Sequence, residues 1–202
     1  MPQVTNLTPG RVIQRQYGKL ALIAVGANME SPVGAPAVTL RQAIAMLAQN
    51  GALIRSVSRF FQTPCFPRDA GPDYVNAALT LQWNASADAI LGLLHDVEAS
   101  FARQRIMRWG QRTLDLDLIA LGDEILPSRD IHDHWRSLSP ELQAKEAPDR
   151  LILPHPRVQD RAFVLGPLRD IAPAWQHPIF GLSIAEMYET LSEQDKNSLT
   201  PL

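Results

Sequence analysis

The stretch RWGQRTLDLDLIAL, residues 108–121, sets Asp115 and Asp117 between leucines, although aspartate is depleted in β-strands. The alternation predicts a strand, TLDLDLIAL, whose leucines face a core. Because side chains in a strand alternate with a period of two, both carboxylates lie on the opposite side, with Cα atoms about 6.8 Å apart. The interpretation of the chain therefore depends on what these two negative charges bind.

The segments before this strand are predicted from hydrophobic periods, turns and caps. They are a strand at 19–28, a helix that Thr39 caps, strands at 52–64 and 74–82, and a helix that Ser86 caps. With the strand that holds the aspartates, the order is β-α-β-β-α-β. This order is typical of ferredoxin-like α+β folds, in which helices pack on one face of an antiparallel sheet.

The pattern weakens after Leu121. Residues 126–149 are polar and read as an insertion with a short helix around 139–145. RLILPHP, residues 150–156, predicts a short extra strand that two prolines stop. SIAEMYETLSE, residues 183–193, predicts a terminal helix.

Composition limits the class of protein. The chain has 202 residues, 46% hydrophobic and 20% charged, which suffices for one domain over 1–202 with residues 1–18 as a tail. Its one cysteine, Cys65, excludes an internal disulfide framework and suits the cytoplasm. No apolar run reaches the roughly 20 residues of a membrane span. A net charge of −2 argues against a general nucleic-acid surface, so we expect a small anionic partner.

Paired carboxylates next to arginines point to phosphate chemistry. Two close carboxylates raise each other's pKa unless a cation such as Mg²⁺ lies between them. The alternative for a bare D-x-D is a solvated strand face. Two basic groups favour the metal, since guanidinium groups beside metal carboxylates can hold a polyphosphate. They are Arg103, Arg105, Arg108 and Arg112 around Trp109, and Arg150, His155, Arg157 and Arg161.

Three classes of function remain open on these residues. No G-x-x-x-x-G-K-[ST] or G-x-G-x-x-G loop occurs, so a phosphotransferase would bind phosphate through side chains. A two-metal hydrolase or nuclease would also use paired aspartates. A non-catalytic nucleotide- or RNA-binding module on a ferredoxin-like fold is the third class. His132 and His134 have metal-like spacing but read as surface residues in the insertion.

Longer motifs separate these classes. RWGQRTLDLDL, FQTPCF followed by DYVNAALTL, and LPHPRVQDRAFVLGPL followed by IAPAW stand in the order found in 6-hydroxymethyl-7,8-dihydropterin pyrophosphokinases. The chain resembles this family over about residues 20–178. The resemblance implies a ferredoxin-like, usually monomeric enzyme of folate biosynthesis. It would transfer pyrophosphate from ATP, with two Mg²⁺ ions, to the pterin hydroxymethyl oxygen and release AMP.

The same resemblance implies roles for individual residues. Asp115 and Asp117 match the Mg²⁺ ligands, and Arg103 and Arg112 match catalytic arginines that hold the phosphates. The positions that match ATP contacts are His95, Glu98, Arg105, Trp109, Leu118, Arg150, Ile152, His155 and Arg161. The positions that match pterin contacts are Gly26, Thr63, Pro64, Cys65, Phe66, Tyr74, Asn76, Trp109, Asp115 and Phe163, the last as a stacking ring.

Overall fold

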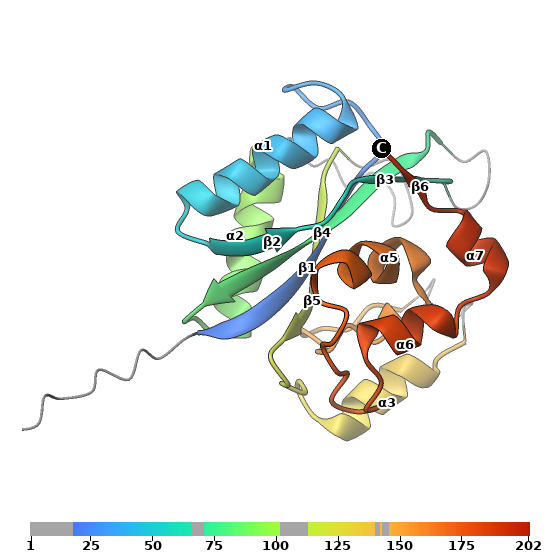
Figure 1. Cartoon of the computed structure of the whole chain (residues 1–202). Helices are drawn as coiled ribbons and strands as arrows, with labels where there is room; N and C mark the ends of the chain where they lie inside the picture. Colours follow the sequence, from blue (N-terminus) through green and yellow to red (C-terminus); the bar gives the residue numbers. More distant parts are fainter. Residues whose placement is uncertain (1–17, 66–70, 102–112, 140–141, 143–145) are drawn as a thin grey trace, which may run out of the picture.

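A computed structural model describes residues 18–65, 71–101, 113–139, 142 and 146–202 (Figure 1). Within these residues six strands form one sheet in the order β5-β1-β4-β3-β6, and β2 also pairs with β4. Every pairing is antiparallel. The strands are β1 (Lys19–Ala27), β2 (Leu53–Val57), β3 (Phe61–Thr63), β4 (Tyr74–Trp83), β5 (Asp115–Leu121) and β6 (Thr200–Pro201). The predicted ferredoxin-like α+β architecture is confirmed.

Helices cover both faces of this sheet (Figure 1). The helical elements are α1 (Pro36–Gln49), α2 (Ala87–Ser100), α3 (Arg129–Ser137), the 3-10 turn η1 (Val158–Asp160), α5 (Ala162–Ile171), α6 (Ile184–Glu189) and α7 (Glu193–Asn197). Helices α1 and α2 lie on one face, while α5 and α6 lie on the other. The second layer extends the pattern expected from the sequence, which placed helices on one face alone.

Strand β1 shows how the two faces are built. Ala21, Ile23 and Val25 belong to the apolar cluster beneath α1 and α2. Leu22 and Ala24 belong to a separate cluster beneath α5 and α6. A strand covered on both faces is apolar at successive positions, which explains the continuous LALIAV run. The prediction of a buried strand here is confirmed.

The first helix begins earlier than predicted. Pro36 occupies its first turn and Ala35 is the N-cap residue, so Thr39 is not the cap. Proline suits this position because its fixed φ is helical and its missing N–H would have had no partner there. Thr39 lies buried inside the helix, where its hydroxyl donates to the carbonyls of Gly34 and Ala35. By contrast, Ser86 caps α2 as predicted, accepting the N–H of Ala89.

The single strand predicted at 52–64 is wrong, because two short strands replace it. β2 and β3 pair with different ends of β4 and are separated at Ser58. The Ser58 hydroxyl accepts the N–H of Ala78 at 2.8 Å and donates to the carbonyl of Arg59 at 2.7 Å. A side chain that bonds to the backbone in this way interrupts a regular ladder.

The insertion differs most from its prediction. It contains α3 at Arg129–Ser137, ahead of the short helix expected around 139–145, most of which lies outside the described residues. His134 is exposed as expected, but His132 is fully buried and its ring centroid lies 5.8 Å from that of His177. Because His132 is buried, the side of α3 that carries it packs against the C-terminal half of the chain. The polar composition of the segment gave no sign of this packing.

Two further expectations for the C-terminal half are corrected. RLILPHP forms only an isolated bridge, in which Leu126 and Leu153 exchange two backbone hydrogen bonds, because Pro154 and Pro156 lack the N–H groups of a ladder. The sheet instead gains β6 at the end of the chain. The terminal helix expected at 183–193 divides into α6 and α7, because Ser192 caps a new helix.

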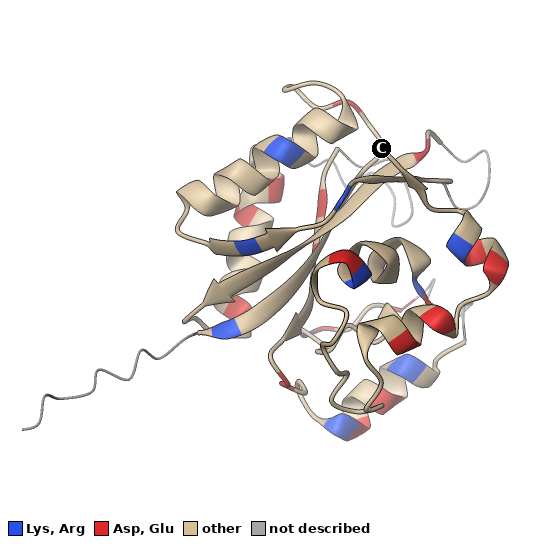
Figure 2. Ribbon diagram, in the orientation of Figure 1, with Lys and Arg blue, Asp and Glu red and all other residues tan. Residues whose placement is uncertain are grey.

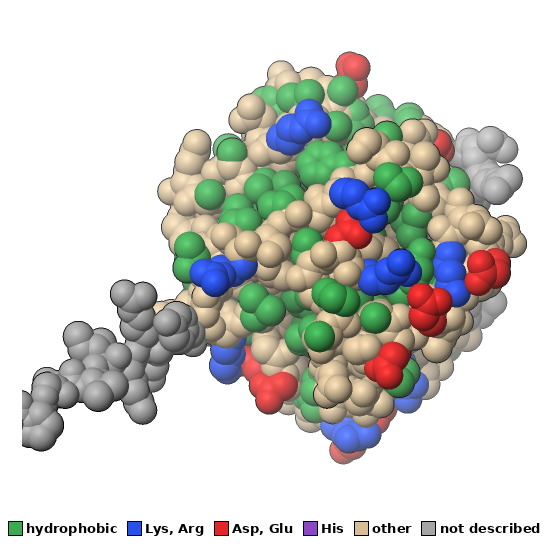
Figure 3. Space-filling view, in the orientation of Figure 1, with side chains coloured by type: hydrophobic (Ala, Val, Ile, Leu, Met, Phe, Trp, Pro, Cys, Tyr) green, Lys and Arg blue, Asp and Glu red, His purple; other side chains and the backbone are tan. Residues whose placement is uncertain are grey.

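Charged residues are sparse on the described strands and gather on helices and loops (Figure 2). On the face shown in Figure 3, acidic and basic side chains are interspersed with hydrophobic ones and form no field of one sign. The described residues on this face therefore form no basic stripe of the kind found at nucleic-acid interfaces. Among the described helices, none has the length and apolarity to cross a bilayer.

Candidate active site

Polar residues from three strands meet at one end of the sheet. Gly26 in β1 is in register with Asn76 in β4 on one side and with Asp115 in β5 on the other. Two residues earlier in β1, Ala24 is in register with Ala78 and Asp117. Since Ala24 and Ala78 lie in the cluster beneath α5, the alternation of strands directs Asn76, Asp115 and Asp117 to that same face.

Small side chains leave space beside the carboxylates. Along this face of β1 the residues shrink from Leu22 to Ala24 to Gly26 as the strand approaches the site. A Cβ added at Gly26 would lie 2.7 Å from Oδ1 of Asn76 and 4.0 Å from Cδ1 of Tyr74. Glycine is therefore required for Asn76 to lie close to β1. Ala24 and Ala78 were not predicted as site residues, although the decreasing size along β1 is visible in the sequence.

Arg161, from the LPHPRVQDRAFVLGPL motif, lies next to the aspartates. It precedes α5 at the N-cap position, and its Nη1 lies 3.9 Å from Oδ2 of Asp117. Its guanidinium carbon also lies 5.7 Å from the centroid of the Phe163 ring. Phe163 is 41% exposed, which is unusual for a large aromatic residue and offers a ring face to a flat ligand. The structure thus brings together Asp117, Arg161 and Phe163 as the sequence analysis expected.

His155 lies beside the same strand in a defined protonation state. Its backbone N–H donates to the carbonyl of Ile119, and its Nδ1 accepts the N–H of Arg157 at 3.1 Å. An accepting Nδ1 is unprotonated, so the neutral ring carries its proton on Nε2. Burial lowers the pKa of His155 well below its usual range, and the charge of Arg161 lowers it further. At neutral pH His155 is therefore a neutral hydrogen-bond donor through Nε2.

The residues expected around the pterin form a second group at this end of the sheet. Thr63 and Asn76 are buried, and Nδ2 of Asn76 donates to Oγ1 of Thr63 at 2.7 Å. Tyr74 is in register with Thr63, while Pro64 is exposed and Cys65 carries a buried free thiol. Because the Asn76 amide is held by Thr63, its orientation is fixed before any ligand binds.

Other predicted contacts occupy different environments. Glu98 is buried on α2, and its Oε1 accepts the N–H of Leu116 at 2.8 Å. His95 is exposed on the same helix, and Leu118 and Ile152 are buried apolar residues. Arg150 is paired with Asp149, whose carboxylate raises the pKa of the guanidinium. The remaining predicted residues, Phe66, Arg103, Arg105, Trp109 and Arg112, lie outside the described residues.

The two aspartates fit a Mg²⁺ site of the open kind. Magnesium in phosphate-transfer sites is usually held by one or two carboxylates, with waters and substrate phosphates as the other ligands. The Asp117 side chain is 40% exposed and so has room for such ligands. The described residues contain no cluster of three or more His, Cys, Asp or Glu that would form a closed protein cage. Two neighbouring carboxylates, one of them this exposed, fit a cation that also binds a phosphate.

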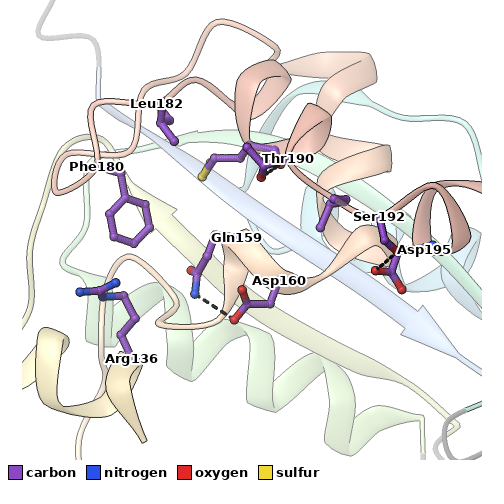
Figure 4. Close-up of a pocket in the computed structure, with 10 residues that line it drawn as sticks. Arg136, Gln159, Asp160, Phe180, Leu182, Thr190, Ser192 and Asp195 are labelled. Atoms are coloured by element: carbon purple, nitrogen blue, oxygen red, sulfur yellow. Dashed lines mark hydrogen bonds between the residues drawn. The ribbon is translucent and has the colours of Figure 1, made fainter. Parts of the chain in front are cut away.

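A separate groove lies among α3, η1, α6 and the start of α7 (Figure 4). It has a volume of about 450 Å³. Arg136 of α3, Gln159 and Asp160 of η1, and Phe180 and Leu182 line part of it. Among the residues that the structure describes, none of those predicted for metal, ATP or pterin binding lines this groove.

Comparison with known proteins agrees with the geometry. Residues 22–173 match the model of the 7,8-dihydro-6-hydroxymethylpterin-pyrophosphokinase family. A 2-amino-4-hydroxy-6-hydroxymethyldihydropteridine pyrophosphokinase from Synechocystis is 35% identical over 84% of this chain and 74% of its own length. The enzyme of the same description from Haemophilus influenzae is 34% identical over 75% of this chain and 81% of its own length.

Solved structures give the same fold. A crystal structure of Plasmodium falciparum HPPK-DHPS with pteroate aligns with 95% of this chain at a TM-score of 0.60, although the sequences are only 11% identical. This chain spans 48% of the length of that longer protein. The likeness at this identity concerns the fold, whereas the family match concerns the sequence. The chain belongs to the 7,8-dihydro-6-hydroxymethylpterin-pyrophosphokinase family.

Proposed function

We propose that the chain transfers pyrophosphate from ATP to 6-hydroxymethyl-7,8-dihydropterin, giving AMP and the pterin pyrophosphate in folate biosynthesis. The observation that carries the proposal is the convergence of Asp117, Arg161 and Phe163 at one end of the sheet, beside Asp115. This convergence unites an acidic pair, a phosphate-binding cation and an aromatic platform. The family match and the two bacterial relatives support the same activity.

The nucleotide would lie over β5. Asp115 and Asp117 would hold two Mg²⁺ ions together with the triphosphate. When bound, Mg²⁺ neutralises phosphate charge and polarises the phosphoryl group that is attacked. An ATP molecule carries about four negative charges and the aspartates two, so two Mg²⁺ leave roughly −2 for arginines. Arg161 supplies a positive charge beside Asp117, and we assign the rest of the neutralisation to Arg103 and Arg112.

His155 would contact a phosphate oxygen as a neutral donor. Its Nδ1 is already engaged by the N–H of Arg157, so Nε2 is the atom available to donate. A neutral donor can bind a phosphate oxygen at any pH above its low pKa. We expect its role to be orientation of the triphosphate, whereas Arg161 contributes charge.

The pterin would lie next to the nucleotide, toward β4. Asn76 offers its remaining amide hydrogen-bonding capacity to the ring edge, and Phe163 offers a stacking face. In this arrangement the hydroxymethyl oxygen attacks the β-phosphorus in line. The new O–P bond forms as the bond from the β-phosphorus to the oxygen retained by AMP breaks, and the hydroxyl proton is lost to solvent. Catalysis then comes mainly from positioning and charge neutralisation.

One assay tests the proposal. Purified protein is incubated with ATP, Mg²⁺ and 6-hydroxymethyl-7,8-dihydropterin, and the products are separated by chromatography. We expect AMP and pterin pyrophosphate in equal amounts, with no AMP when the pterin is left out. Release of ADP, or nucleotide hydrolysis that does not depend on the pterin, would contradict the proposal and favour a hydrolase.

We also propose that the enzyme is monomeric, as the resemblance to the family implies, and that it acts in the cytoplasm. The buried free thiol of Cys65 is compatible with a reducing compartment. Light scattering coupled to size-exclusion chromatography should give the mass of one 22.4 kDa chain. A mass of two chains would contradict the first part of this proposal.

A further inference from the structure

Glu98 is a buried carboxylate whose position the proposed chemistry does not explain. It lies in the last turn of α2, is 2% exposed, and accepts the backbone N–H of Leu116 at 2.8 Å. Leu116 is the residue between Asp115 and Asp117. A carboxylate is rarely buried unless its hydrogen bonds serve a structural or functional need.

Glu98 reaches the aspartates through the backbone, from the opposite face of the sheet. Helix α2 packs on the cluster that contains Leu114, Leu116 and Leu118, whereas the aspartates belong to the α5 face. Among the described strands β5 pairs only with β1, so it is an edge strand. The outward N–H groups of an edge strand need a partner, and Glu98 supplies one at the peptide between the two proposed metal ligands.

A fixed peptide at this point determines how both carboxylates are presented. The peptide plane that contains the Leu116 N–H is joined directly to the Cα of Asp115, and Asp117 follows one residue later. If this plane rotates, the two side chains no longer point to the same ion. Groups that orient metal ligands without touching the metal typically change metal affinity or activity by about 10- to 100-fold when they are replaced.

We infer that Glu98 is a positioning residue, which holds the Leu116 N–H so that Asp115 and Asp117 present their carboxylates to a shared divalent-cation site. The inference rests on the proposed metal role of the aspartates. It assigns Glu98 a role through β5, in contrast to the direct ATP contact that the family resemblance implies.

The test separates the reach of the side chain at position 98 from its charge. Glu98→Gln keeps the length and an acceptor oxygen but removes the charge, whereas Glu98→Asp keeps the charge but shortens the side chain. Glu98→Leu removes both, and Asp96→Asn changes an exposed carboxylate on the same helix as the control. For each variant, NMR hydrogen exchange measures protection of the Leu116 amide in protein without metal or nucleotide. Activity titrations then give the Mg²⁺ concentration for half-maximal rate.

We expect the Mg²⁺ concentration for half-maximal rate to rise in those variants whose Leu116 amide loses protection from exchange, whether or not position 98 carries a charge. Variants that lose protection should need about 10- to 100-fold more Mg²⁺, and Asp96→Asn should match the wild type. The inference would be overturned if the Mg²⁺ concentration for half-maximal rate depended on the charge at position 98. It would also be overturned if this concentration stayed constant while the Leu116 amide lost its protection. Should Glu98→Leu fail to fold, the Asp and Gln variants alone provide the same contrast.

A further variant distinguishes this inference from the proposed function. Asp117→Asn should raise the Mg²⁺ requirement while leaving protection of the Leu116 amide unchanged. If Asp117→Asn leaves the requirement unchanged, the proposed metal site itself is wrong. If Asp117→Asn raises the Mg²⁺ requirement, but loss of the hydrogen bond between the Leu116 N–H and position 98 does not, only the role of Glu98 is wrong.

Discussion

The two faces of the sheet use the same strands for different purposes. Beneath α1 and α2, the odd-numbered residues of β1 from Ala21 to Val25 pack in a continuous apolar layer. Beneath α5, the apolar layer ends at Ala24, and the next row across the sheet is Asp115, Gly26 and Asn76. The first face therefore supplies stability. The second supplies stability at one end and the candidate active site at the other.

The largest expected effect separates function from stability on the second face. Asp117→Asn should lower kcat/KM by at least about 10³-fold, which corresponds to about 4 kcal/mol, because the metal site loses a charged ligand. Its free energy of unfolding should stay close to that of the wild type, because Asp117 is partly exposed. Steady-state kinetics and urea denaturation check the two halves of this prediction. Normal turnover would rule out the metal role.

The matching change on the first face should have the opposite result. Leu79→Ala removes a fully buried side chain of β4 beneath α1 and α2, so the free energy of unfolding should fall by about 3 kcal/mol. The fraction of this variant that is folded should keep a KM for ATP within about twofold of the wild type, because Leu79 lies in β4 on the face opposite the aspartates. A large change in KM with little loss of stability would show that the two faces are not independent.

Acid should weaken the second face more than the first. The pKa of His177 is lowered to about 4, mainly by burial and also by the charges of the nearby His132 and Arg136. The imidazole titrates near 6.5 in the unfolded chain, so between pH 6.5 and 4 the unfolded state binds more protons. The contribution of His177 to the free energy of unfolding is therefore fully present above pH 6.5. It is lost as the pH falls from 6.5 through 4, and at pH 4 the loss is about 3 kcal/mol.

Urea denaturation at pH 7 and pH 4 measures this loss. His177→Phe should reduce the difference between the two pH values, whereas the exposed His134→Asn should leave it unchanged. Hydrogen exchange at pH 4 should show opening of α3 and the 175–183 segment before α1 and α2. Equal acid sensitivity of wild type and His177→Phe would assign the effect to other groups.

The smallest expected effect concerns recognition of the pterin. Asn76→Ala removes an amide that Thr63 orients, so KM for the pterin should rise about tenfold, or about 1.4 kcal/mol, while KM for ATP changes little. Gly26→Ala should act in the same direction, because its Cβ would displace Asn76. Thr80→Val, a buried change further along β4, is the control and should leave both KM values unchanged. An equal rise in both KM values would contradict a pterin-specific role.

The sequence specified the central sheet because its signals were local and mutually consistent. Alternation identified β5, and Ser86 was correctly predicted as the cap of α2. Thr39 was misassigned because Pro36, three residues earlier, satisfies the start of α1 better. The break at Ser58 depends on a bond to Ala78, twenty residues away, which no local pattern reveals.

The candidate site was predicted in part for the same reason. The D-x-D pattern places Asp115 and Asp117 on one face without knowledge of the fold. Their proximity to Arg161, by contrast, arises because the His155 N–H bonds to Ile119 and returns the chain to β5. The bond from Glu98 to Leu116 and the burial of His132 are also products of tertiary packing, so periodicity could not identify them.

The most direct measurement is a crystal structure of the protein with Mg²⁺, a non-hydrolysable ATP analogue and the pterin. We predict that carboxylate oxygens of Asp115 and Asp117 lie about 2.0–2.1 Å from Mg²⁺ that also contacts the phosphates of the analogue. Arg161 should contact the same phosphates. A complex in which both ligands are bound, but neither aspartate contacts a metal ion, would contradict the account.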